Sequence, residues 1–161
     1  MKKSKKGNGI IAMSFIIAIM LTALPLPDWA VNWRPDWVAV VLIYWCMAVP
    51  DRIGIFVAWF LGLLLDVQQG NALGQNALSM TLIAFLTINS YQRMRAYPLL
   101  QQAVLVCFYL LLYKLVMLLI LVYLGLNKSD WTYWMPAITS MLLWPWLFII
   151  LRDVRRKHRI S

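Results

Sequence analysis

Residues 37–65 read WVAVVLIYWCMAVPDRIGIFVAWFLGLLL, an apolar run that is interrupted in its middle by Pro50-Asp51-Arg52. A single helix over this run would be about 44 Å long, whereas the hydrocarbon core of a bilayer is about 30 Å thick. Proline also removes a backbone donor and breaks the interior of a helix. We therefore predict a tight hairpin of two short helices, over residues 35–49 and 53–68.

The composition around this hairpin is typical of a membrane protein. Of the 161 residues, 63% are hydrophobic and 13% are charged, whereas about a quarter of the residues in a soluble domain are charged. We predict an all-α polytopic membrane protein in which residues 1–161 form a single integral membrane domain. The net charge of +9 then serves topology and contact with anionic membrane lipids, and we expect no nucleic-acid partner.

Four further apolar stretches complete a set of six predicted spans. They cover residues 9–26, 71–91, 99–126 and 131–151. The first follows a basic flank, as the core of a secretory signal does. It is longer than the usual core of about 7–15 residues and ends in Pro25-Leu26-Pro27. We expect this first span to remain uncleaved.

Lysine and arginine indicate the orientation of the spans. With six spans and a cytoplasmic N-terminus, the outer segments hold only Arg34 and Lys128. One span in place of the hairpin would move Arg93, Arg95 and the basic C-terminal tail outside. The positive-inside rule therefore predicts six spans with both termini in the cytoplasm. The basic residues of the inner segments are Lys2, Lys3, Lys5, Lys6, Arg52, Arg93, Arg95, Arg152, Arg155, Arg156, Lys157 and Arg159.

The remaining basic residue, Lys114, lies near the middle of the fifth span. A charge at that depth costs roughly 2.5–3.5 kcal/mol on insertion scales, which makes Lys114 a candidate functional residue. Alternatively, its side chain extends to the interface or pairs with an acid inside the bundle, for which Asp66 is the obvious choice. Tyr109 and Tyr113 flank the lysine and are further candidate partners.

Two short motifs at predicted span ends allow both a structural and a functional interpretation. Asp66, followed by Gly70 and Gly74, either caps the next helix or binds a partner. Asp36, in the run Arg34-Pro35-Asp36-Trp37, suits the positive end of a helix. Arg34 either pairs with Asp28 or Asp36 or meets a partner. In the first span, Ser14, Ala18 and Thr22 recur every four residues and predict a packing face.

Signatures of enzyme chemistry are missing from the sequence. The one histidine, His158, lies in the basic tail, and the chain has no glutamate. The two cysteines, Cys46 and Cys107, lie in apolar runs without metal-binding spacing. We therefore predict a protein that is not an enzyme and that uses no metal or cofactor.

Several of these segments, in their order along the chain, resemble the rod shape-determining MreD family. They are Arg34-Pro35-Asp36-Trp37, Tyr44-Trp45, Pro50-Asp51-Arg52, Gly62-x-x-x-Asp66 with Gly70 and Leu73-Gly74, Leu143-Trp144-Pro145-Trp146, and the basic tail. The resemblance implies a multi-pass protein of the bacterial inner membrane, with a bundle similar to the substrate-binding subunits of energy-coupling factor transporters. It also implies a non-enzymatic component of the cell-elongation complex that binds MreC, near RodA, its class B penicillin-binding protein and MreB filaments, and supports lateral peptidoglycan synthesis and rod shape.

Two hypotheses about function follow. In the first, the bundle binds partner proteins. The outer candidates are Arg34, Asp36, Trp37, Asp66, Gly70 and Gly74, and an inner basic face of Arg93, Arg95, Arg155, Arg156 and Lys157 meets lipid or filament. In the second, the protein is a small-molecule-binding subunit of a membrane transporter. The spans hold few polar residues to line a transport site, which favours the first hypothesis.

Overall fold

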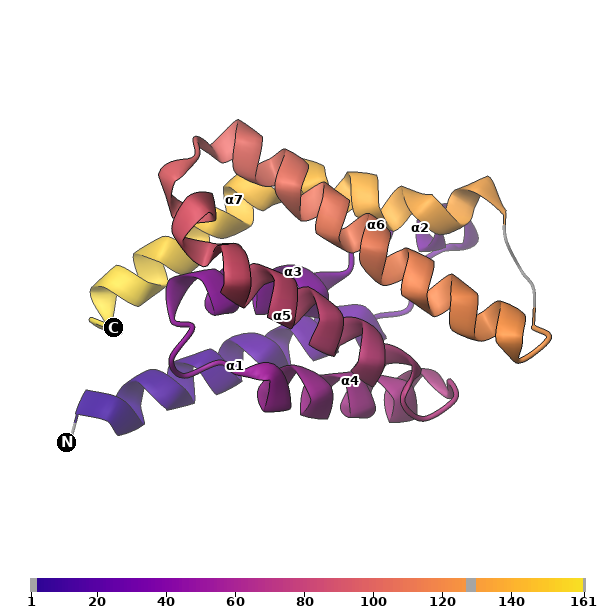
Figure 1. The fold of residues 1–161 in the computed structure, drawn as a ribbon, viewed down its shortest axis with the longest axis horizontal. Coiled ribbons are helices and arrows are strands. Elements are labelled where there is room, and N and C mark those ends of the chain that lie inside the picture. Colours follow the sequence, from indigo (N-terminus) through magenta and orange to yellow (C-terminus); the bar gives the residue numbers. More distant parts are fainter. Residues whose placement is uncertain (1–2, 127–129, 161) are drawn as a thin grey trace.

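The computed structural model describes residues 3–126 and 130–160, and this part of the chain is entirely helical outside its turns. Lys2 and Lys128, which the sequence assigns to inner and outer segments, lie outside the described residues. The long helices run alternately between the two ends of a bundle, and both chain ends lie at the same end (Figure 1). The elements are α1 (Lys3–Ala23), α2 (Asp28–Val31), α3 (Trp37–Ala48), α4 (Ile55–Gln69), α5 (Gln75–Ala96), α6 (Leu99–Tyr123), the 3-10 helix η1 (Trp131–Trp134) and α7 (Met135–Lys157).

The predicted break into two short helices is confirmed, but they do not pack against each other as a tight hairpin; α3 packs against α1 and α5, and α4 packs against α5. Helix α3 ends at Ala48 and α4 begins at Ile55, with Pro50-Asp51-Arg52 in the turn between them. Each of the other predicted ranges also contains one long helix, although the boundaries differ. Helices α5 and α7 extend beyond the predicted ends, to Ala96 and Lys157, and α1 stops at Ala23.

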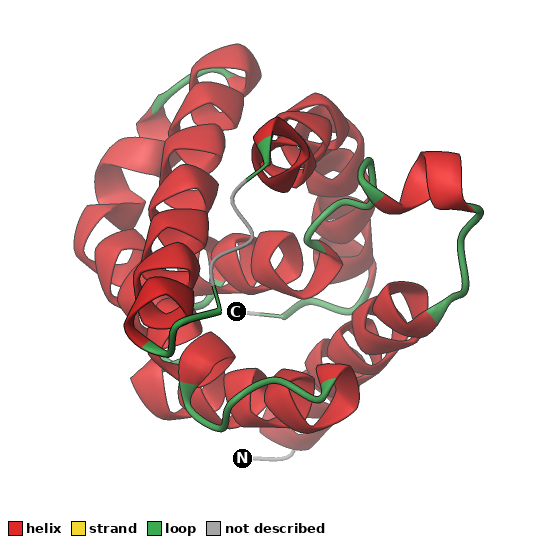
Figure 2. Ribbon diagram, turned by 90° about the vertical axis from the view of Figure 1, so that its right-hand side faces the viewer, coloured by secondary structure: helices red, strands yellow, loops and turns green. Residues whose placement is uncertain are grey.

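Among the described residues, two helical segments are long and apolar enough to cross a membrane, namely Leu99–Tyr123 and Trp131–Lys157. Three shorter apolar helices accompany them, at Gly7–Ala23, Trp37–Ala48 and Ile55–Gln69. The short helix α2 lies at the margin of the bundle (Figure 2) and contains no buried residue.

Helix α3 forms the centre of the bundle. Ten of its twelve residues are buried, from Val38 to Met47, and it packs against α1, α5 and α7. A helix that is apolar on all sides is stable only when other elements surround it. Because α3 is short, about 18 Å at 1.5 Å per residue, its neighbours cover it along its whole length.

The small-residue face predicted for α1 packs against α3. The Trp45 indole nitrogen donates a hydrogen bond to Ser14 Oγ over 2.8 Å, and Ala18 is buried. Small side chains at this spacing let the helix backbones approach closely. The hydrogen bond also satisfies the one polar atom of a fully buried tryptophan.

Helices α4 and α5 approach each other most closely at Gly62. A Cβ atom at this position would overlap the backbone of Ala77, and it would lie 2.7 Å from the carbonyl carbon of Asn76. Only glycine therefore permits this contact. It brings the first turn of α5 against α4, one helical turn before Asp66.

Candidate functional site

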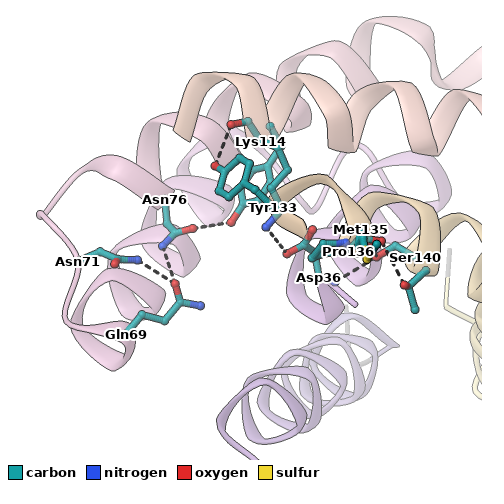
Figure 3. Close-up of polar contacts among 11 residues, drawn as sticks. Asp36, Gln69, Asn71, Asn76, Lys114, Tyr133, Met135, Pro136 and Ser140 are labelled. Atoms are coloured by element: carbon teal, nitrogen blue, oxygen red, sulfur yellow. Dashed lines mark hydrogen bonds and ion pairs between the residues drawn. The ribbon is translucent and has the colours of Figure 1, made fainter. Parts of the chain in front are cut away.

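The Lys114 ammonium group forms an ion pair with Asp36, which precedes the first residue of α3. Lys114 Nζ lies 3.2 Å from Asp36 Oδ1, and the two side chains are only 13% and 17% exposed. The ammonium group also lies 5.7 Å from the ring centre of Tyr113 and 5.2 Å from that of Tyr133. The Tyr133 hydroxyl donates to the Lys114 carbonyl over 2.9 Å (Figure 3). The charge is thus compensated by one carboxylate and two aromatic faces.

Of the alternatives left open for Lys114, the structure shows the pairing with an acid inside the bundle, but Asp66, the expected partner, is the wrong acid. The start of α3 lies beside α6, which brings Asp36 to the lysine. The carboxylate of Asp66 is used elsewhere. Of the two flanking tyrosines, Tyr113 contacts the ammonium group, whereas the Tyr109 hydroxyl is hydrogen bonded to Ser90 over 2.6 Å.

Asp66 caps α5, as one of the two sequence interpretations predicted. Its Oδ2 accepts from the Gly74 amide over 2.9 Å, and its Oδ1 accepts from the Asn76 amide over 2.9 Å and from Asn76 Nδ2 over 3.0 Å. Gly70 and Gly74 have φ values of 67° and 100°, which only glycine adopts without cost. The Gly62-x-x-x-Asp66 motif is therefore a helix junction, in which the glycine permits close approach and the aspartate satisfies the free amides of the next helix.

Tyr113 connects the Asp66 cap to the ion pair. Its hydroxyl donates to Asn76 Oδ1, while its ring lies below the Lys114 ammonium group. On the other side, Asn76 Nδ2 donates to Gln69 Oε1 over 3.3 Å. One side chain of α6 therefore contacts both the cap between α4 and α5 and the ion pair with α3.

The start of α7 joins the same network. The Asp36 amide donates to Ser140 Oγ over 3.0 Å, and the Ser140 hydroxyl donates to the Pro136 carbonyl over 2.7 Å. The contacts around Asp36 thus connect α3, α6 and α7, and those around Asn76 connect α4, α5 and α6. We call this set the polar cluster; it comprises Asp36, Asp66, Asn76, Tyr113, Lys114 and Ser140.

Arg34 fastens the end of α1 instead of forming an ion pair with Asp28 or Asp36. Its Nη1 donates to the Thr22 carbonyl over 2.8 Å and its Nη2 donates to the Leu24 carbonyl over 2.6 Å. The last carbonyls of a helix have no partner within the helix and carry partial negative charge, so a guanidinium group stabilises them.

A small hollow of about 180 Å³ lies beside the ion pair and is lined by Arg34, Asp36, Trp37 and Lys114, among others. Two buried polar atoms at this place, Arg34 Nε and Asp36 Oδ2, have no hydrogen-bond partner within the described part of the chain. The structure therefore brings three of the predicted outer candidates to one hollow. Asp66 is fully buried and reaches this site only through Asn76 and Tyr113.

The predicted inner basic residues lie at the opposite end of the bundle. Arg93 and Arg95 belong to the last turn of α5, and Arg155, Arg156 and Lys157 belong to the last turn of α7. Positive charge is favourable at these two helix C-termini.

Sequence reasoning missed the roles of Asn76, Ser140 and Tyr133. Asn76 carries a weak signal, because it and Gln75 are two amides in the first turn of a predicted span. Ser140 and Tyr133 carry none, since serine and tyrosine are ordinary residues at the end of a span. Their importance depends on contacts between segments that are distant in sequence.

The structure defines an all-helical protein in which polar side chains join the helices of one bundle. Comparison with known proteins identifies the family: the model for the rod shape-determining protein MreD matches residues 3–154. The chain is also 32% identical over 146 residues to the rod shape-determining protein MreD of Haemophilus influenzae. This alignment covers 91% of this chain and 90% of that protein. No solved structure matches the chain. This chain belongs to the MreD family.

Membership of this family supports a role in determining rod cell shape. It is a family of shape-determining structural proteins and is not known for catalysis, and it forms part of the rod-shape system. The family and the two long apolar helices together indicate a membrane protein.

Proposed function

We propose that this protein is a six-span scaffold of the bacterial cell-elongation complex in the inner membrane, with both termini in the cytoplasm. It binds MreC, lies near RodA, its class B penicillin-binding protein and MreB filaments, and supports lateral peptidoglycan synthesis. The proposal includes a bundle similar to the substrate-binding subunits of energy-coupling factor transporters. The observation that carries it is the match of the MreD family model to nearly the whole chain.

The arrangement of the helices supports six spans. The helices α1 and α3 to α7 alternate in direction (Figure 1), and the helix ends and the turn at one end of the bundle hold most of the basic residues. Arg52 follows α3, Arg95 closes α5, and Arg155 and Arg156 close α7. A bundle with its positive charges gathered at one end fits the positive-inside rule, which gives that end to the cytoplasm.

The polar cluster and its hollow support the opposite, outer end as the surface that meets MreC. Arg34 and Asp36 line the hollow, and each has one buried polar atom without a partner in the described part of the chain. Trp29 and Trp131, which are 79% and 92% exposed, precede α3 and α7 at the same end. Exposed tryptophans are common both as interface anchors and as membrane-interface residues. Asp66 contributes through the shape of the turn that contains Gly70 and Gly74.

The polar cluster argues against a transport site at the outer end of the bundle. Small-molecule sites usually have volumes of about 300–1,000 Å³; the hollow beside Lys114, at about 180 Å³, is too small, and only the hollow at the opposite end, at about 880 Å³, falls within that range. Most polar atoms of the cluster are bonded to other helices of the same bundle. The cluster therefore supports a rigid surface better than a site that captures and releases a solute.

The test is an affinity pull-down of the tagged protein in mild detergent, read by mass spectrometry. We expect recovery of MreC together with cell-wall synthesis enzymes. Arg34→Ala should reduce this recovery, whereas the matched control Arg93→Ala, at the other end of the bundle, should leave it unchanged. Tryptophan fluorescence checks that both variants are folded. Recovery of an ATPase pair with a transmembrane coupling subunit would replace this proposal with the transport hypothesis.

A further inference from the structure

A second, wider hollow opens at the end of the bundle that holds the chain termini. It has a volume of about 880 Å³ and lies among the end of α3, the end of α5, the start of α6 and the end of α7. Its lining includes four arginines, Arg95, Arg155, Arg156 and Arg159, and one acid, Asp51. The formal excess is three positive charges within one concave surface.

Arg95 is held in place by the end of α3. Its Nε donates to the Met47 carbonyl over 2.9 Å and its Nη2 donates to the Ala48 carbonyl over 2.7 Å. These bonds satisfy carbonyls that the end of a helix leaves free. They also position the guanidinium charge at the wall of the hollow, above the ring of Tyr91 at 5.0 Å.

The C-terminal turn brings Arg159 to the same wall. The Ile160 amide donates to the Arg155 carbonyl over 3.1 Å, and the Arg159 amide donates to the Arg156 carbonyl over 3.2 Å. This pattern is a Schellman motif, in which the residue after the helix is left-handed and usually glycine. Here that residue is Arg159, with a φ of 49°. The side chain of Ile160 is buried close to Gly7 of α1 and fixes the turn.

Two buried polar side chains that line this hollow have an atom without a partner. Gln102 Nε2 donates to the carbonyls of Met94 and Tyr97 over 2.8 and 3.1 Å, which fixes the orientation of the amide and leaves Oε1 free. The Tyr44 hydroxyl likewise has no hydrogen-bond partner in the described part of the chain. The two residues are 3% and 1% exposed. Buried polar atoms normally have partners, so these two indicate polar atoms that enter the hollow.

We propose that this hollow binds the phosphodiester headgroup of an anionic membrane phospholipid. Guanidinium groups match the geometry of phosphate oxygens and bind them with charge-assisted hydrogen bonds. The apolar part of the lining, which includes Met47, Val49 and Phe148, suits the glycerol and acyl carbons of a lipid and not a free phosphate ion. Basic pockets between helices at the cytoplasmic side are known places for such headgroups. The volume and the excess charge favour a lipid with two phosphates, such as cardiolipin. This site is independent of the proposed binding of MreC.

The test titrates the purified full-length protein with defined lipids and measures binding by native mass spectrometry. The probes are cardiolipin, phosphatidylglycerol, zwitterionic phosphatidylethanolamine and inorganic phosphate. We expect cardiolipin to bind more tightly than phosphatidylethanolamine. The double variant Arg156→Gln and Arg159→Gln should weaken cardiolipin binding by about tenfold or more, since it removes two guanidinium groups that form charge-assisted hydrogen bonds with phosphate.

The matched control is the double variant Arg93→Gln and Lys157→Gln. It removes the same charge from exposed residues of the predicted inner basic face that do not line the hollow, so it separates the hollow from that wider face. We expect its cardiolipin affinity to stay within about twofold of the wild type, because general electrostatic attraction alone is unspecific. Equal losses in the two double variants would overturn the proposal.

Two further results separate the alternatives. Binding of inorganic phosphate with the same dependence on Arg156 and Arg159, without a preference among lipids, would assign the hollow to a soluble phosphate compound and contradict the lipid proposal. Equal affinity for all three lipids would contradict the lipid proposal and would indicate that the arginines bind an acidic protein segment instead. Tyr44→Phe keeps the buried ring and removes one orphaned hydroxyl, so weaker cardiolipin binding without lower thermal stability would place that hydroxyl at the headgroup. Unchanged binding would exclude it.

Discussion

The ion pair between Asp36 and Lys114 allows a quantitative test of the polar cluster by a double-mutant cycle. Lys114→Met keeps an unbranched side chain but leaves a carboxylate that is only 17% exposed without its cation. Breaking a fully buried pair costs about 3–5 kcal/mol. Because some exposure remains, we expect a loss of about 2–3 kcal/mol in the free energy of unfolding.

The two single variants should differ. Asp36→Asn leaves the ammonium group over the rings of Tyr113 and Tyr133, at 5.7 and 5.2 Å, and each aromatic face contributes about 1 kcal/mol when partly desolvated. The loss should therefore be smaller, about 1–2 kcal/mol. The double variant removes both charges and should lose no more than about 1 kcal/mol, which gives a coupling energy of at least about 2 kcal/mol.

The assay is unfolding in mixed micelles by increasing sodium dodecyl sulfate, followed by the fluorescence of the nine tryptophans. Trp45 and Trp144 are fully buried, so their emission reports the loss of packing. The matched control is the exposed pair Asp153 and Lys157 on α7, with the same substitutions to Asn and Met. The stability losses of the two single variants of that pair should add up to the loss of the double variant within about 0.5 kcal/mol. Additivity at Asp36 and Lys114 would refute the reasoning.

Three further predictions concern the helix junction and the topology. Gly62→Ala should destabilise the protein by about 2 kcal/mol or more because the new Cβ meets the backbone of Ala77. The control is Gly9→Ala, in open space on α1, which should be neutral or slightly stabilising. Chemical unfolding measures the stability of both variants. Asp66→Asn should lower the free energy of unfolding by about 2–3 kcal/mol, because one oxygen of a fully buried acceptor is replaced by an NH2 group that donates. An unchanged unfolding midpoint would contradict the role of Asp66 as the cap of α5. In spheroplasts, a membrane-impermeant maleimide should label Leu73→Cys, in the turn before α5, but not Asp51→Cys, in the turn after α3; labelling of both, or of the second alone, would contradict six spans with a cytoplasmic N-terminus.

Local signals in the sequence predicted the helices α1 and α3 to α7, but not the short helices α2 and η1. The length of the apolar run at residues 37–65 and the proline within it predicted the break between α3 and α4, because helix length and bilayer thickness are fixed quantities. The Asp66 cap was also a local inference, since the acceptor and the helix start that it satisfies are only a few residues apart.

The partner of Lys114 could not be predicted from local signals in the sequence. The sequence indicates that a charge inside a span needs compensation, but the choice between Asp36 and Asp66 depends on which helices are neighbours in space. The same holds for Ser140, whose hydroxyl meets the amide of Asp36. The hollow near Arg95 depends on the left-handed turn at Arg159, and arginine gives no sequence signal for that conformation.

The central claim is that this chain determines rod cell shape, and the most direct measurement is complementation. A rod-shaped Gram-negative bacterium depleted of its own MreD would express either this protein or the Asp66→Asn variant, and cell length and width would be measured by microscopy. We expect the wild-type chain to restore rods and the variant, at matched membrane abundance, to restore them poorly. Cells that remain round despite wild-type protein at normal abundance in the membrane would contradict the claim.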